Sequence, residues 1–437
     1  MHSTYRHDLK IYSSDEGRCL KTAGAFTKGF LNLDGELTPI IVSMVRKDDV
    51  AQELLDLRNH KLDLGDVMKI LSNSLNHSGK LEESLSSYVD FDHLNSNELE
   101  IIRSVGEPLE LMKKLYKNIK ELTKIIRSHL NLKNKNYYIH PLDMKPNNEV
   151  LTSEDENQKS SMDRNKGSFL ACGQENLILV FKRWRKLEID FFDRKNEIFN
   201  ISKIPDIHDS IRYDMIHNYQ YFGTMADNIG FKIYESAEIL ARFLTPYEYG
   251  IIKKRKFDIG MTIIEPLFTK IKSDLLWWNT PVTQSKENYR EESDYWMIRN
   301  NGKRENIDDL KDHSQKIKSK WRHVRTRLYF TSASHLYSMF NVIKYGADSL
   351  FIHNKEEINK IDFLNYLSHI VFRLFENLTI DSKDPKRFRL ELHVSSGNAA
   401  KIHEQYKRHN APISPLILVN KNLSLSQLEE FFKMVKK

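Results

Sequence analysis

The hydrophobic pattern near the start of the chain predicts a strand that runs through a polar turn into a helix. Residues 10–12 favour a strand, and the polar residues 13–15 are typical N-cap residues. Apolar residues then recur at helical spacing, at Leu20, Ala23, Phe26 and Phe30. Arg18 is therefore expected in the first helical turn, beside unpaired N–H groups and the positive end of the helix dipole, where anions bind.

A second junction of the same kind is predicted far downstream. Residues 324–330 alternate like a strand, residues 331–334 supply three hydroxyl groups, and a helical pattern opens at His335. If the two strands are parallel neighbours, both junctions face the crevice at the carboxyl edge of the sheet. A guanidinium can clamp phosphate oxygens and an imidazole can donate a proton, so Arg18 and His335 together suit a phosphoryl site.

Regional differences in composition and hydrophobic periodicity predict an α/β core built from both ends of the chain, with a mostly helical cap inserted between them. Polar, weakly periodic stretches cannot bury enough apolar surface to order themselves, and we interpret them as surface insertions. In order, the predicted parts are the first part of the core (1–60), a helical cap (61–130), a polar insertion expected to be disordered (131–176), the cap continued (177–279), a second polar insertion (280–320), the second part of the core (321–397), with strands near 324–330 and 387–394, and a tail (398–437).

Residues 2–18 closely resemble the phosphatase-like domain of the bifunctional diphosphoinositol pentakisphosphate kinases. Further matches keep their order along the chain: residues 28–31, 35–42, Arg183-Trp184, 186–188, 201–207, Tyr213-Asp214, His217-Asn218, 248–251, 322–332, Ser334-His335, Arg387-Phe388 and 391–393. The resemblance covers most of residues 2–397 and fades beyond Gly397.

The resemblance implies a histidine-acid-phosphatase-like fold, also called phosphoglycerate-mutase-like. In that family an ATP-grasp kinase domain phosphorylates inositol hexakisphosphate or its derivatives, and the phosphatase-like domain removes the same class of phosphate. This chain resembles the second domain alone, so ATP and Mg would act only through an absent kinase domain. For the phosphatase-like domain the resemblance implies no cofactor and no metal.

The first motif of that domain, Arg-His-x-x-Arg-x-Pro with its nucleophilic His, is not found in this chain. Arg-His pairs occur at residues 6–7, 322–323 and 408–409, but none has the rest of the motif in place. We therefore expect the first strand, the nucleophile and its helix to be missing, and the sheet to be open at one edge.

The resemblance gives Arg18 the role of phosphate clamp and His335 that of the second active-site histidine, which is the catalytic residue expected in this chain. The other predicted phosphate contacts are Arg6, Lys10, Ser14, Arg325 and Ser334. A first-turn arginine could instead pair with a nearby carboxylate such as Asp15. The proton donor is absent from its usual positions, because Leu336 follows His335 and Ala333 stands where relatives often have Glu.

Two classes of function remain open on this basis. One is a phosphohydrolase that acts on inositol pyrophosphates and is fused to the kinase that makes them. The other is a catalytically inactive phosphatase fold that binds inositol polyphosphates and regulates a kinase. The kinase domain of the same polypeptide is an expected partner in either case.

The amino-acid composition indicates a cellular compartment and a class of ligand, but it does not indicate the reaction. Cys19 and Cys172 are the two cysteines among 437 residues, which favours a reducing, cytosolic compartment. No apolar run approaches the roughly 18 residues that a membrane span needs. The formal net charge is +7. Basic residues from Lys316 to Arg327 suit the rim of a site for a highly phosphorylated substrate. Nucleic acid is the competing partner, but no nucleic-acid-binding motif accompanies them.

Overall fold

The computed structural model describes residues 9–32, 44–56, 64–130, 177–222, 226–276, 325–346, 352, 354–381, 384–398, 413–428 and 430. The two predicted polar insertions, 131–176 and 280–320, lie outside the described residues, and so does Arg6.

A parallel sheet joins the two ends of the predicted core. Strand β1 (Leu9–Ser13) pairs in parallel with β5 (Thr326–Phe330), from Leu9 opposite Thr326 to Ser13 opposite Phe330. The short strand β2 (Val45–Arg46) lies on the other side of β1, which gives the order β2-β1-β5. The predicted parallel neighbours are therefore confirmed.

The two faces of this sheet pack against different helices. Helix α2 (Gly17–Phe30) packs on one face, where Ile11 and Ala23 are buried in a small core. On the other face Tyr12 stacks on Tyr329 with ring centroids 5.0 Å apart. The Tyr329 hydroxyl donates a 3.2 Å hydrogen bond to Asp274 of α14 (Lys253–Leu276). Alternate residues of each strand thus serve opposite faces, as strand geometry requires.

A second sheet follows in the sequence. Strands β6 (His369–Glu376), β7 (Phe388–Ser395) and β8 (Ile417–Leu423) are antiparallel in that order. Strand β7 confirms the strand predicted near 387–394, whereas β6 was not predicted. The prediction that residues 398–437 form a tail is wrong for β8, because this strand pairs with β7 and buries Val419 and Leu423.

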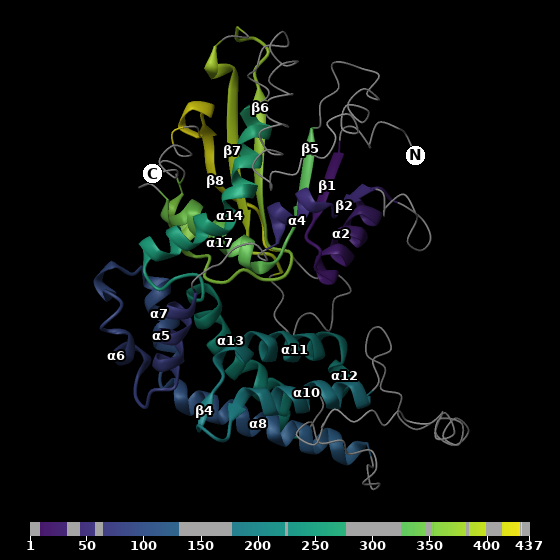
Figure 1. Ribbon diagram of the computed structural model, residues 1–437, viewed down its shortest axis with the longest axis vertical. Coiled ribbons are helices and arrows are strands. Elements are labelled where there is room, and N and C mark those ends of the chain that lie inside the picture. The colour runs from purple at the N-terminus through teal and green to yellow at the C-terminus, as the bar shows by residue number, and fades with distance from the viewer. Residues whose placement is uncertain are drawn as a thin grey trace, which may run out of the picture.

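The described elements between β2 and β5 are mostly helical, and Figure 1 shows most of them gathered below the two sheets. These are α4 (Asp49–Leu55), α5 (Gly65–Leu75), α6 (Leu81–Leu85), α7 (Ser96–Val105), α8 (Pro108–His129), α10 (Leu177–Phe191), the hairpin β3 (Phe192–Asp193) and β4 (Ile198–Phe199), α11 (Ile204–His217), α12 (Tyr219–Phe222), α13 (Ile229–Tyr247) and α14. Helix α17 (Ala333–Tyr345) follows β5 and packs on α14, and α18 (Lys355–Asn359) precedes β6.

Candidate functional site

The two predicted junctions lie side by side at the carboxyl ends of β1 and β5. Arg18 is the second residue of α2 and His335 the third residue of α17, so both stand in first helical turns as predicted. The backbone N–H of Ser14 donates a 2.9 Å hydrogen bond to the carbonyl of Phe330, which continues the pairing into the turn. The parallel register therefore brings the N-termini of two helices to one edge of the sheet.

Neither helix is capped by a side chain. The N-cap of α2 is Glu16 rather than one of residues 13–15, so that part of the sequence prediction is wrong. The N-cap of α17 is Ser332, and its side chain also makes no capping hydrogen bond. The first turns thus keep N–H groups that no capping side chain occupies, which is the condition for anion binding at a helix N-terminus.

The C-terminal end of α4 holds both turns in place. Thr331 donates from Oγ1 to the carbonyl of Leu55 over 3.0 Å. Asp56 accepts from the backbone N–H of Asp15 at 3.5 Å and is 6% exposed. Sequence reasoning did not select Asp56, because no periodicity or motif links it to the two junctions.

Arg18 extends outward from this edge. Its Nε lies 2.6 Å from Oε2 of Glu16, and its side chain is 73% exposed. Burial acts against the charged guanidinium, but the hydrogen bond and charge of Glu16 outweigh it and raise the pKa of Arg18. The predicted alternative of a carboxylate partner is thus realised with Glu16 rather than Asp15.

The charge of Arg18 also acts on the helical part of the molecule. Asp209 of α11 belongs to its electrostatic neighbours. Burial and the nearby Asp209 raise the pKa of Tyr366, and Arg18 opposes that rise. Burial and Glu248 raise the pKa of Tyr249, again against Arg18. The charge of Arg18 therefore acts over electrostatic range on α11 and on the segments that contain Tyr249 and Tyr366.

Three predicted site residues point inward instead. Ser14 is fully buried, Ser334 is 7% exposed and His335 is 1% exposed. The hydroxyl oxygens of Ser332 and Ser334 lie 2.6 Å apart. The structure thus brings the backbones of Ser14, Arg18, Ser334 and His335 to one edge, while among these side chains that of Arg18 is the one open to solvent.

Lys10 and Arg325 do not join this group. Lys10 lies opposite Arg327 in the register of β1 and β5, three residues before the end of β1. Burial, Arg46 and Arg327 lower its pKa. Arg325 precedes β5 and therefore lies at the amino end of the strand, opposite the edge where His335 begins its helix.

Glu248 is a titratable group near this region that sequence reasoning did not select. It lies between α13 and α14, half-buried, next to Tyr249. Burial and the negative charge of Asp206 raise its pKa to about 7. A carboxyl group of this kind can hold a proton at neutral pH, which is a property of proton donors. Residues 248–251 belong to the family resemblance, but a raised pKa depends on tertiary neighbours, so nothing in the sequence singled out Glu248 as a site residue.

Several residues that carry the family resemblance form a buried network in the helical part. Asp214 is completely buried and accepts hydrogen bonds from Arg183 at 2.7 Å, Trp184 Nε1 at 2.7 Å and Asn218 at 2.8 Å. Glu188 likewise accepts from Thr123 at 2.7 Å. These residues hold α8, α10 and α11 together, so their part in the resemblance is explained by packing.

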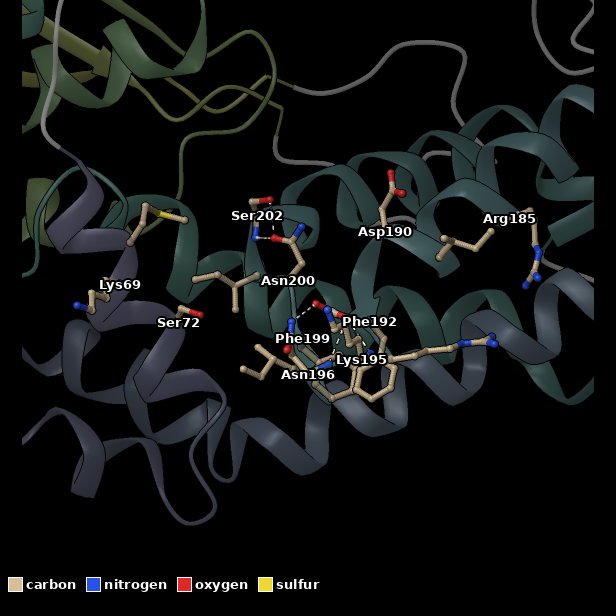
Figure 2. A pocket seen from close by; sticks show the side chains of 16 residues that line it. Lys69, Ser72, Arg185, Asp190, Phe192, Lys195, Asn196, Phe199, Asn200 and Ser202 are labelled. Carbon is tan, nitrogen blue, oxygen red and sulfur yellow. Dashed lines mark hydrogen bonds between the residues drawn. The ribbon is translucent and has the colours of Figure 1, made fainter. Parts of the chain in front are cut away.

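A cavity of about 800 Å³ lies in the helical part between α5, α10 and the β3–β4 hairpin. Figure 2 shows Lys69 of α5 at one end and Arg185 of α10 at the other. The hairpin turn between them is held by Asp193, which accepts from the backbone N–H of Lys195 at 2.9 Å. None of the predicted site residues lines this cavity.

Within the described ranges, no group of three or more His, Cys, Asp or Glu side chains could hold a metal ion. The described helices also include none that is both long and apolar enough to cross a membrane.

The comparisons with known proteins agree with this geometry. Residues 1–395 match the family described as the histidine phosphatase superfamily (branch 2). An inositol hexakisphosphate and diphosphoinositol-pentakisphosphate kinase of Arabidopsis thaliana is 34% identical over 489 residues, which cover 100% of this chain and 45% of the relative. The corresponding kinase 2 of Homo sapiens is 34% identical over 413 residues, 91% of this chain and 28% of the relative.

A kinase of the same description from Saccharomyces cerevisiae is 22% identical over 97% of this chain and 36% of its own length. The chain therefore spans less than half the length of these relatives. No solved structure matches it. With the family match over nearly its whole length, and with paired strand–helix junctions at the carboxyl edge of a parallel sheet, the chain belongs to the histidine phosphatase superfamily (branch 2).

Proposed function

We propose that this chain is a histidine-phosphatase domain that binds inositol polyphosphates and pyrophosphates at the edge formed by α2 and α17. The observation that carries the proposal is the parallel register of β1 and β5, which places two uncapped helix N-termini together. The substrate class comes from the names of the relatives, which are kinases of inositol hexakisphosphate and diphosphoinositol pentakisphosphate.

Arg18 is the proposed phosphate clamp. Its guanidinium is exposed and paired with the exposed Glu16, so an incoming phosphate can replace that carboxylate at little cost. A phosphate accepts two hydrogen bonds from one guanidinium and carries more charge, which favours the exchange. The neighbouring N–H groups of the first turn of α2 add to the attraction.

Hydrolysis would need a nucleophilic histidine on a further strand. We propose that such a strand pairs with the free side of β5 and fills the space between β5 and β6. Among the described strands β5 pairs with β1 alone and β6 with β7 alone. Most residues of both strands are half-buried or exposed, while β1 and β7 are mostly buried. A strand carrying Arg-His-x-x-Arg-x-Pro would cover this surface and add the nucleophile.

An inactive binding module is the second candidate function. Ala333 and Leu336 occupy the positions where a proton donor is expected, and His335 is 1% exposed. In this case the chain would bind inositol polyphosphates without releasing phosphate. Glu248, with a pKa of about 7, is the described carboxyl group that could replace the donor if the domain is active.

Calorimetric titration with inositol hexakisphosphate tests the binding proposal. We expect Arg18→Ala to weaken binding about tenfold or more, because a charge-assisted bidentate contact is lost. Arg103→Ala is the matched control, since Arg103 is also exposed and paired with a glutamate, Glu82, at 2.9 Å. Equal affinities of wild type and Arg18→Ala would overturn the assignment of the clamp.

Phosphate release from a diphosphoinositol polyphosphate separates the two candidate functions. We expect none from this chain as it stands. We expect release when the chain is extended at its N-terminus with the strand that carries the nucleophile motif of a relative. Release without that strand would overturn the proposal that the nucleophile lies outside these residues, and no release with it would favour the binding module.

A further inference from the structure

A small enclosed cavity lies apart from the carboxyl edge, where α7, α13, α14 and α17 meet. Its volume is about 30 Å³, and its walls include Glu98 of α7, Tyr247 of α13, Lys256 of α14 and Asn341 of α17. A cavity of this size holds one or two waters or a single small ion, and it is too small for a phosphate group. The volume therefore limits any occupant to a few atoms.

The cavity contains buried polar groups that lack partners. Tyr247 is 2% exposed and Asn341 is 5% exposed. The Tyr247 hydroxyl and the Asn341 Nδ2 atom have no hydrogen-bond partner among the described residues. Both groups can donate a hydrogen bond, and leaving them unsatisfied costs about 1–3 kcal/mol each. An acceptor placed in the cavity would remove this cost.

The charges around the cavity do not cancel. Lys256, Lys344 and Arg242 line it together with the carboxylates Glu98 and Asp362, which leaves one positive charge in excess. Arg242 pairs with Asp362, and Glu98 accepts from Tyr345 at 2.9 Å and from the backbone of Asn95 at 3.0 Å.

Among the three cations that line the cavity, Lys256 has the least solvent contact. It is 5% exposed, and its Nζ lies 4.2 Å from the centre of the Tyr247 ring. Burial lowers its pKa to about 8, with Glu98 opposing and Lys344 and Lys253 adding to the shift. At neutral pH the lysine therefore still carries its charge in a closed space, where an uncompensated charge is costly.

We propose that this cavity binds one small monovalent anion of the chloride class, held by Tyr247, Asn341 and the charge of Lys256. The anion supplies the missing acceptor and balances the excess charge. Because α17 also contains Ser334 and His335, occupancy would fasten the helix of the candidate site to α13 and α14. This inference does not depend on the proposed phosphatase function.

Thermal unfolding in chloride and in gluconate at equal ionic strength and neutral pH tests the proposal. We expect the melting temperature to be about 2–4 °C higher in chloride, because a ligand that binds the folded state alone stabilises it. Tyr247→Phe and Asn341→Leu should each abolish this difference. Tyr116→Phe is the control, since Tyr116 is a partly buried tyrosine of α8 outside the cavity.

An equal melting temperature in both salts, or the same difference in the two cavity variants, would overturn the proposal. Crystals of the wild-type chain grown in bromide give a second readout that does not depend on the folding of the variants. An anomalous bromide peak inside the cavity supports the site. Water at that position in saturating bromide refutes it.

Discussion

Asp214 in the helical part and strand β5 in the parallel sheet differ in how completely the chain's own residues surround them. In the helical part, the buried carboxylate of Asp214 accepts hydrogen bonds from three donors, Arg183 and Trp184 of α10 and Asn218, which directly follows α11. In the sheet, β1 is mostly buried while β5, its direct neighbour, has no fully buried residue. The buried carboxylate of Asp214 is thus satisfied by residues of the helical part itself, whereas every residue of β5 stays partly or fully exposed.

This difference divides the residues that match the family into two groups, one that stabilises the fold and one at the candidate site. Residues that match the family within α10 and α11 are explained by a satisfied buried network, so they stabilise the fold. Residues that match it at the ends of β1 and β5 stand beside uncapped helix termini, where no packing role accounts for Arg18. The resemblance alone gives both groups the same weight, and burial distinguishes them.

The largest expected effect is a loss of stability when the buried hydrogen-bond network around Asp214 is removed. Asp214→Ala leaves the cation of Arg183 and two further donors without their buried acceptor, and we expect a loss of about 3–5 kcal/mol in the free energy of unfolding. Urea unfolding measures this loss. Asp92→Ala is the control, because Asp92 is exposed and should change stability by less than about 0.5 kcal/mol. Equal effects of both variants would contradict the structural role of Asp214.

A second pair of variants compares the two strands of the sheet directly. Ile11 of β1 lies opposite Leu328 of β5 in the register, but Ile11 is 1% exposed and Leu328 is half-buried. We expect Ile11→Ala to cost about 2–5 kcal/mol and Leu328→Ala about 1 kcal/mol, measured by urea unfolding. Similar losses would show that β5 is packed as fully as β1, which would remove the argument for an additional strand.

Glu248 is expected to make the stability of the folded chain depend on pH. Its pKa in the folded chain is about 7, above the ordinary value of 4.5. A folded state that binds the proton more tightly is favoured at low pH, so this contribution to stability is present below about pH 4.5 and is lost as the pH rises to about 7. We expect the wild type to lose about 2 kcal/mol over this window relative to Glu248→Gln.

Urea unfolding at several pH values measures this difference, with Glu121→Gln on the surface of α8 as the control. Parallel pH profiles of the wild type and Glu248→Gln would contradict the raised pKa.

The smallest expected effect concerns Arg18 itself. Its ion pair with Glu16 is exposed, and such pairs contribute little to stability. We expect Arg18→Ala to change the free energy of unfolding by less than about 0.5 kcal/mol, in the same preparation whose affinity for inositol hexakisphosphate falls. A loss of stability comparable to that of Asp214→Ala would place Arg18 with the structural residues instead.

Local patterns predicted much of the sheet and its helices. The strands β1, β5 and β7 and the helices α2 and α17 all have short, regular hydrophobic periods. The N-cap of α2 was predicted too early, because Ser13 and Ser14 continue the strand pairing with β5 instead of starting the helix. Strand β8 was missed because it becomes a strand only through pairing with β7.

The candidate site was predicted less completely than the fold. Arg18 and His335 were selected from their place after a strand, and the structure brings their two helices together. Lys10 and Arg325 were selected by charge, but the position along a strand decides which edge a residue occupies, and both lie before its end. Asp56 and Glu248 were not selected, since their relevance comes from neighbours distant in the sequence.

The two strand–helix junctions and the residue types in their first turns follow from the sequence alone, because local periodicity and turn chemistry decide where strands end and helices begin. The packed fold was needed to show that Asp214 is structural, that His335 is buried while Arg18 is exposed, and that the pKa of Glu248 is raised to about 7. Burial, register and electrostatic surroundings depend on segments that are far apart in the chain, and no local pattern contains that information.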